Sequence, residues 1–236
     1  MRAQATPINV GGVIWDPDST TSLPSLNDFF ASGKLIETPV ALSGDILTAQ
    51  GSVQNLNSSL TNQSRFCPGC ELTFSFSAEL VGFNPLPPAS VIPDVIDATF
   101  LFKDFTISFY VDTAQNLTGA DYGSATDGDL WLQLESHLLS GQDFNLGSGS
   151  DTGTGASLLN AVDGLAMANF DTNLKAGGAD MFLSSSFGSG AAPDGLLAGT
   201  FELFGDPVKV SELSSLALLG LGMLALGFGA RRKSAT

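Results

Sequence analysis

The sequence predicts a mainly β protein: an antiparallel β-sandwich or jelly-roll-like ectodomain followed by a single C-terminal transmembrane helix. Apolar and polar residues alternate with a period of two in several runs, which is typical of strands with one buried face. Segments rich in Gly, Pro, Ser and Asp separate these runs, and helical periodicity is scarce, which favours an antiparallel fold. An uncharged apolar run near the C-terminus predicts the membrane helix.

The composition fits one large extracellular β domain with polar loops. Charged residues make up 14% of the 236 residues, below the roughly 25% of typical soluble domains, whereas Gly and Phe are abundant at 27 and 17. The net charge of −15 repels phosphate backbones, and no basic stripe offsets it, so the sequence argues against nucleic-acid binding. The acidity fits solubility outside the cell or weak cation binding and does not decide between them.

The first residues are similar to the end of a secretory signal. Ala3, Gln4 and Ala5 form the A-x-A pattern that precedes a cleavage site, although no apolar stretch comes before it in this sequence. Residues 1–6 are therefore interpreted as the remnant of a signal from a longer precursor. A short leader on a chain that starts at Met1 is the alternative.

The first elements expected along the chain are a short strand and a helix. The strand ends where Pro17 keeps the preceding residue out of helical geometry. The helix is capped by Ser25, places Phe29 and Phe30 on one apolar face and ends near Gly33.

The later elements are expected to be strands. The segments that alternate, or nearly alternate, with period two are residues 42–53, 71–83, 99–112, 130–138 and 196–204. Turn-rich segments lie between them, among them 84–93 with four prolines and the Gly-Ser-rich 141–155. Because no internal repeat is visible, residues 7–205 are predicted to form one domain, and 206–212 a linker that carries a sorting motif.

The C-terminal run from Leu213 to Ala230 contains 18 residues without a charge. As a helix it would rise about 27 Å, close to the hydrocarbon core of about 30 Å, so 213–230 is predicted to span a membrane. A buried C-terminal helix is the alternative, but such helices normally show a polar face. The basic residues Arg231, Arg232 and Lys233 then place the tail, 231–236, on the cytoplasmic side.

This end of the chain resembles the PEP-CTERM sorting signal of Gram-negative exopolysaccharide producers. In that family a Val-Pro-Glu-Pro-Ser-Ser motif precedes an apolar helix and a basic end. This chain matches the motif at Val210, Glu212, Ser214 and Ser215, while Ser and Leu replace the two prolines.

The resemblance implies an exported protein that an exosortase-type peptidase recognises at the membrane and cleaves near Glu212. The implied route is an inner-membrane intermediate and then the outer surface or the extracellular matrix, with exopolysaccharide as a further partner. Without cleavage, the apolar helix would remain as a plain anchor.

The ectodomain is also similar to secreted members of the same group. The similarity rests on a Phe-Cys-Pro-Gly-Cys-Glu-Leu-Thr-Phe box at Phe66–Phe74 and a Phe-Asp-Thr-Asn segment at Phe170–Asn173, with Gly-Gly-Ala-Asp at 177–180. This resemblance implies family membership and no biochemical mechanism.

Cys67 and Cys70 are the two cysteines of the chain, and their spacing allows three interpretations. A redox pair would need a helix N-terminus to stabilise the thiolate, whereas here a strand follows directly. A zinc site would need two further soft ligands, and the chain offers only His137. In an oxidising compartment, a structural disulfide across the Pro-Gly turn is the leading interpretation.

His137 and a set of aspartates are the remaining candidates for chemistry. His137 is the only histidine, and no G-x-S-x-G motif accompanies it, so a structural histidine is favoured over a catalytic triad. Asp121, Asp127 and Asp129 provide oxygen ligands that suit Ca²⁺, but they lack the EF-hand spacing, and Asp-Gly turns are common without a metal. No other cofactor is expected, and Asp180 is a weaker candidate.

Carbohydrate recognition is the main alternative function. No pair of carboxylates is marked out as a glycosidase pair among the 24 acidic residues. Trp15, Trp131, Tyr110 and Tyr122 could stack on sugar rings or be half-buried strand residues. Trp131 and Tyr110 fall on the polar phase of their strands, which favours a surface platform.

Taken together, these patterns predict an exported protein without catalytic activity, with a structural or interaction role at the cell surface or in the polysaccharide matrix. A carbohydrate-binding or carbohydrate-active ectodomain and a simple tail-anchored envelope protein are the competing hypotheses.

Overall fold

The computed structural model describes residues 7–17, 28–57, 63–85, 98–117, 123–139, 142–143, 145–148, 152–188 and 195–208. The mainly β prediction is confirmed, because strands dominate this part of the chain. The helical elements within it are single turns: α1 (Gln63–Phe66), η1 (Gly123–Ala125), α2 (Met167–Phe170) and η2 (Ala176–Gly178).

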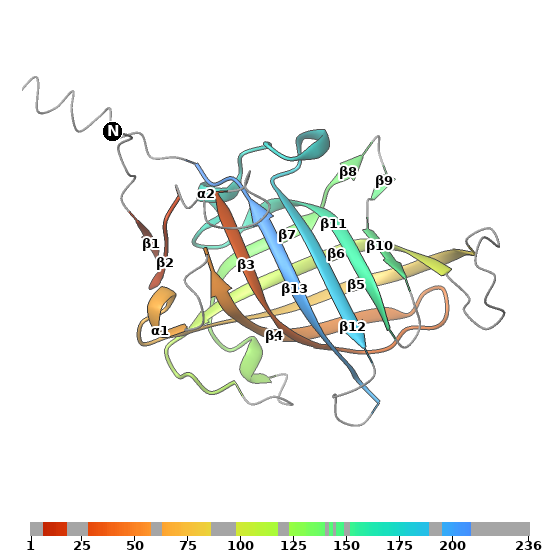
Figure 1. The fold of residues 1–236 in the computed structure, drawn as a ribbon, viewed down its shortest axis with the longest axis horizontal. Coiled ribbons are helices and arrows are strands. Elements are labelled where there is room, and N and C mark those ends of the chain that lie inside the picture. The colour runs from red at the N-terminus through yellow and green to blue at the C-terminus, as the bar shows by residue number, and fades with distance from the viewer. Residues whose placement is uncertain are drawn as a thin grey trace, which may run out of the picture.

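The strands of the described part form one closed antiparallel barrel (Figure 1). Its eight members within these residues are β3 (Phe29–Glu37), β4 (Ile46–Leu56), β5 (Glu71–Pro85), β6 (Ala98–Asp112), β7 (Asp129–Ser136), β11 (Thr152–Asp163), β12 (Met181–Gly188) and β13 (Leu197–Gly205). The order runs β11-β12-β13-β3-β4-β5-β6-β7, and β7 pairs again with β11. At one end of the barrel, β10 (Asn145–Ser148) lies between β6 and β11.

The predicted β-sandwich is wrong. Pairing of β7 with β11 joins the two ends of the sheet, so no two separate sheets face each other. Alternation along a strand reports only that one face is buried, and a sandwich and a barrel share that property. Among the described residues, no helix is long and apolar enough to cross a membrane. Residues 1–6, 210–215 and the predicted helix and basic tail, 213–236, lie outside the described residues.

The helix predicted from Ser25 to Gly33 is also wrong in its described half. Phe29 begins strand β3, in which buried and more exposed residues alternate as far as Glu37. Gly33 lies in the middle of this strand, at a register shift in the pairing with β4. A Cβ atom there would collide with the Ser52 carbonyl oxygen of β4 and with the Phe201 ring. Glycine therefore allows close strand packing here and does not end a helix.

Two short hairpins accompany the barrel. The first consists of β1 (Ile8–Val10) and β2 (Val13–Trp15), and the second of β8 (Leu138–Leu139) and β9 (Gln142–Asp143). Together with α1 and α2, the β1–β2 hairpin lies at one end of the barrel, which we call the capped end (Figure 1). The turn-rich segment expected at 141–155 instead contains β9, β10 and the start of β11.

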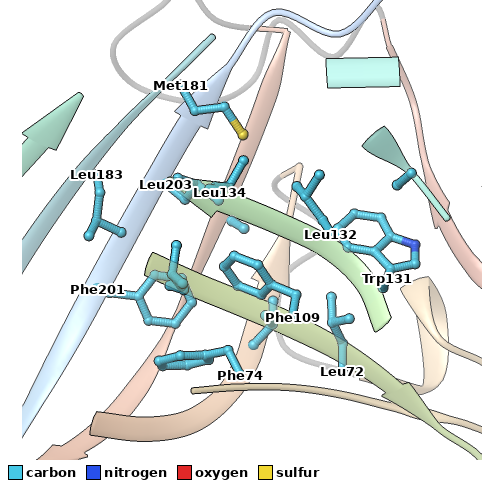
Figure 2. Packing of buried hydrophobic residues seen from close by; sticks show 14 of the residues in the cluster. Leu72, Phe74, Phe109, Trp131, Leu132, Leu134, Met181, Leu183, Phe201 and Leu203 are labelled. Carbon is cyan, nitrogen blue, oxygen red and sulfur yellow. The ribbon is translucent and has the colours of Figure 1, made fainter. Parts of the chain in front are cut away.

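The barrel interior is filled by large apolar side chains from facing strands, so it is a packed core (Figure 2). Those labelled in the figure include Leu72, Phe74, Phe109, Leu132, Leu134, Met181, Leu183, Phe201 and Leu203. Phe74 and Phe201 meet edge to face, with ring centroids 4.5 Å apart.

Aromatic residues close the capped end. The Trp15 ring stacks on Phe170 of α2 at 5.5 Å and meets Trp131 of β7 edge to face at 5.8 Å. Trp131 is only 1% exposed, and its Nε1 donates to the Val10 carbonyl of β1 over 3.0 Å. These three rings thus hold the hairpin and α2 onto the barrel.

The predicted aromatic surface platform is therefore wrong for Trp131, and Trp15, which was also considered for sugar stacking, is buried too. The pairing of β6 with β7 shifts register between Phe109 and Tyr110, and this shift places Trp131 opposite no single partner. A bulge of this kind breaks the period of two, so that Trp131 and Leu132 are both buried. Tyr110 is partly buried and Tyr122 lies outside the described residues.

Candidate functional site

The sulfurs of Cys67 and Cys70 lie at disulfide distance, as the predicted pairing requires. Both cysteines are buried in a tight turn after α1, where the Cys70 N–H donates to the Cys67 carbonyl over 3.0 Å. Gly69 has a φ of +83°, a value that glycine adopts without steric cost. Phe66, 1% exposed, belongs to the same apolar core as the capped end. The Phe66–Phe74 segment around these cysteines therefore helps to close the capped end of the barrel.

Glu71, which follows the disulfide directly, is a structural acceptor that the sequence did not reveal. It is 5% exposed, and its Oε1 accepts from the backbone N–H groups of Asn116 and Leu117 over 2.9 and 3.0 Å. The Gln115 side-chain amide donates to the Cys70 carbonyl over 3.1 Å. The loop after β6 is therefore fixed by the disulfide box.

The same loop crosses the outer face of β4 and β5 before β7 begins. Its single turn η1 contacts both strands, and Ser124 and Ala125 are buried there. The Thr73 hydroxyl of β5 donates to the Ala125 carbonyl over 2.9 Å. This arrangement covers part of a sheet face that would otherwise be open to solvent.

Asp180 has a structural role in the second similarity segment, which comprises residues 170–173 and 177–180. It is 2% exposed, and its carboxylate accepts three backbone N–H groups, from Ala161, Thr172 and Asn173, over 2.8, 2.7 and 2.6 Å. These bonds tie the segment after α2 to β11. A buried carboxylate that accepts three backbone N–H groups stabilises the fold and is not free to act as a ligand.

His137 also has structural partners. Its Nδ1 lies 2.8 Å from Asn160 Oδ1 and its Nε2 lies 3.2 Å from the Gly177 carbonyl oxygen. Both ring nitrogens thus face oxygen acceptors, and within the described residues no hydroxyl or thiol nucleophile is bonded to the ring. The predicted structural role fits these contacts.

The predicted calcium ligands are only partly described. Asp127 Oδ2 accepts a hydrogen bond from the Asn116 side chain over 3.0 Å, and Asp129 begins β7 with its side chain exposed. Asp121 lies outside the described residues. Within the parts of the chain that the structure places, no three His, Cys, Asp or Glu side chains gather around a common point that could hold a metal. The calcium site stays a prediction.

Two hollows lie on the outer face of the barrel, one on each side of Gln50. The first has a volume of about 640 Å³ and is lined by β13, β3 and β4 together with Leu117 of the loop. The second has a volume of about 430 Å³ and is lined by β4, β5 and β6 together with Thr126. Gln50 lines both, so we treat the two hollows as one feature, the outer groove.

Gln50 and Lys34 stand out among the polar side chains of the outer groove that have no partner within the described residues. Gln50 is only 3% exposed, yet its Oε1 accepts no hydrogen bond. Lys34 is exposed and forms no ion pair with any described carboxylate. An amide buried without a partner costs free energy, commonly about 1–3 kcal/mol, so such a group is a pointer to a ligand.

Glu37 is a further unpartnered group, and it lies on the inner face of the barrel. It follows the inward-facing phase of β3, is 4% exposed and pairs across the sheet with Ala49 and Leu197. No hydrogen bond reaches its carboxyl from the described residues. Burial raises the pKa of this carboxyl to about 7. An alternation that ends on Glu is the signal that could have identified it, had residues 29–37 been interpreted as a strand.

No protein-family model, no curated protein and no solved structure matches the chain.

Proposed function

We propose that the chain is an exported protein of a Gram-negative envelope, without catalytic activity of its own, that a C-terminal sorting signal directs to the cell surface or the polysaccharide matrix. Its role there is structural or interactive. The closed barrel is the functional unit, and the C-terminal residues supply the address.

The observation that carries the proposal is the Cys67–Cys70 pair, whose buried sulfurs lie at disulfide distance. Disulfides form and persist in oxidising compartments such as the periplasm and the cell surface and are rare in the cytosol. Both sulfurs are buried, and the bond closes a turn that fixes a neighbouring loop, which supports a structural role rather than redox exchange.

The C-terminal sequence supports the sorting step. Val210, Glu212, Ser214 and Ser215 match the sorting motif in register, and the basic residues stand at the end of the apolar run. Recognition by an exosortase-type peptidase, with cleavage near Glu212, follows from this match.

The absence of catalysis is proposed because three side chains of the types used in acid–base chemistry, those of Asp180, Glu71 and His137, are bound in the fold. Asp180 and Glu71 accept backbone N–H groups, and both ring nitrogens of His137 face Asn160 and Gly177. A general base that is held in this way is poorly placed to activate a nucleophile.

Mass spectrometry of the mature C-terminus, in strains with and without an exosortase, tests the sorting proposal. We expect a chain that ends near Glu212 in the first strain and an intact C-terminus in the second. A Glu212→Ala variant should accumulate uncleaved, whereas Glu202→Ala, which removes an exposed carboxylate from the barrel, should be processed as the wild type. An intact C-terminus in both strains would refute processing.

Thiol labelling of cells tests export separately. The two cysteines should resist alkylation until a reductant is added. Free thiols in the protein isolated without reductant would contradict export to an oxidising compartment.

A further inference from the structure

We propose that the outer groove binds a linear, hydroxyl-rich saccharide that carries a carboxylate, with Gln50 at the centre of the site and Lys34 holding the acid. The proposal does not depend on the sorting signal, because it concerns only the outer face of the barrel.

The outer groove follows one row of cross-strand neighbours. The pairing register joins Ala198 of β13 to Ile36 of β3, Ile36 to Gln50 of β4, Gln50 to Ser75 of β5, and Ser75 to Ser108 of β6. At about 4.8 Å between neighbouring strands, this row is about 20 Å long. The hollows on either side of Gln50, about 640 and 430 Å³, fall in or near the size range of small-molecule sites. A ligand that reaches both hollows therefore has to be extended rather than compact.

The amide of Gln50 favours a hydroxyl partner. Its Oε1 is buried without a hydrogen bond, and no described residue bonds its Nε2. Rotation about the terminal side-chain bond brings either end of the amide toward a hollow. A hydroxyl both donates and accepts, so it satisfies whichever end it meets.

The residues that line the outer groove also favour a ligand rich in hydroxyl groups. The hydroxyls of Ser52, Ser75 and Ser108 line it and make no hydrogen bond within the described residues. Ile36 and Leu117 add apolar surface, against which the C–H face of a sugar ring can pack. Hydroxyls and apolar patches side by side match a saccharide better than a wholly polar or wholly apolar ligand.

The charge of the outer groove is opposite to that of the chain. Neither hollow is lined by a carboxylate in the described structure, and Lys34 is the one charged side chain that lines it there. The nearest acid along β13, Glu202, is exposed and makes no ion pair with Lys34. In a chain with a net charge of −15, this local reversal favours one carboxylate at the Lys34 end.

Other ligand classes fit the outer groove less well. Every strand beneath the groove is already paired on both sides, so a peptide cannot join the sheet as an added strand. A nucleic acid would bring one phosphate per nucleotide against the net negative charge of the protein.

Calorimetric titration of the full-length protein with a galactose trisaccharide in which one terminal residue is galacturonic acid, so that it carries a single carboxylate, and with the neutral galactose trisaccharide, tests the proposal. We expect the acidic sugar to bind about tenfold more tightly, since a charge-assisted hydrogen bond is worth about that factor or more. Lys34→Met should reduce its affinity about tenfold, to that of the neutral sugar. Gln50→Leu should weaken both sugars roughly two- to tenfold, the value of one hydrogen bond.

Two further variants keep the test decisive. Lys103→Met removes a lysine that is bonded to Glu79 and lines neither hollow, so it should bind both sugars as the wild type does. Gln54→Leu, at an exposed lining position, tests the outer groove if the buried Gln50 variant fails to fold. Absence of binding at millimolar sugar, or wild-type binding by the variants at positions 34, 50 and 54, would overturn the proposal.

Discussion

The buried carboxyl of Glu37 should make the stability of the barrel fall as the pH rises. Its side chain is 4% exposed on the inner face of β3, between Ala49 and Leu197 on the neighbouring strands. No hydrogen bond from the described residues stabilises its charged form. Desolvation by burial is therefore the cause that raises its pKa from 4.5 to about 7.

The sign of the effect follows from which state releases the proton first. Because the pKa of Glu37 is higher in the folded state, the unfolded chain loses this proton at lower pH. Its contribution to stability is complete below pH 4.5 and is lost as the pH rises to about 7. The difference between the two pKa values corresponds to about 3 kcal/mol, a large part of the stability of a domain.

Urea denaturation of the wild type and a Glu37→Gln variant between pH 5 and 8.5 measures this effect. The amide cannot ionise, so the free energy of unfolding of the variant should gain about 2 to 3 kcal/mol over that of the wild type across this range. Any constant offset from burying an amide cancels, because only the change with pH is compared. Glu135→Gln, on the exposed face of β7, is the matched control and should show no such gain. A difference between Glu37→Gln and the wild type that stays constant with pH would refute the reasoning.

Three further predictions concern the motif boxes and the capped end. Replacing Cys67 and Cys70 by serine should lower the free energy of unfolding by about 2 kcal/mol, the value for a disulfide that closes so short a loop. Urea denaturation without reductant measures this loss, and an unchanged midpoint would contradict a stabilising role. Asp180→Asn removes a charged acceptor of backbone N–H groups and should lower the free energy of unfolding by about 2 to 3 kcal/mol. Hydrogen exchange should become faster in the segment after α2. Exchange rates that change uniformly across the barrel would argue against this local role. Trp131→Phe should lower the free energy of unfolding by about 1 to 2 kcal/mol more than Trp15→Phe, because Trp131 loses a hydrogen bond while Trp15 Nε1 is buried without one. Thermal denaturation measures the difference, and equal midpoints for the two variants would refute the comparison.

The strands that could be predicted from the sequence are those whose inward positions are apolar. β5, β6, β7 and β13 show the period of two because large side chains fill the barrel from these strands. In β11, by contrast, Gly153, Gly155 and Ser157 occupy the phase that pairs with the inward residues of β12. Small residues at these positions produce no apolar alternation, so the start of β11 resembled a loop.

Closure of the barrel could not be predicted because it depends on a contact between distant segments. Pairing of β7 with β11 brings Leu134 opposite Ala161, and nothing in either segment specifies that partner. The phase of Trp131 was mispredicted for a related reason, since the register shift that buries it arises only when β6 and β7 pair.

In the candidate site, too, contacts between residues close in sequence could be predicted, whereas contacts between distant segments could not. The disulfide was predictable because both cysteines lie within one turn, three residues apart. Glu71 receives its hydrogen bonds from a segment far along the chain, so its sequence context shows only an acidic residue. Asp180 accepts from nearer residues, but the bond from Ala161 forms only when the segment after α2 packs against β11. The outer groove is assembled from five strands and a loop, and no single stretch of sequence contains it.

The Phe66–Phe74 segment with its disulfide contacts the loop that lines the outer groove, so the disulfide should affect ligand binding as well as stability. Cys70 and Glu71 hold Gln115, Asn116 and Leu117 through three hydrogen bonds, and Leu117 lines the larger hollow. Reduction of the disulfide loosens the turn that presents the Cys70 carbonyl, whereas the barrel strands that carry Gln50 remain paired on both sides. The reduced protein should therefore bind the acidic saccharide more weakly while its barrel amides stay protected from exchange. A loss of affinity that appears only when those amides also exchange would mean that the box acts through global stability alone.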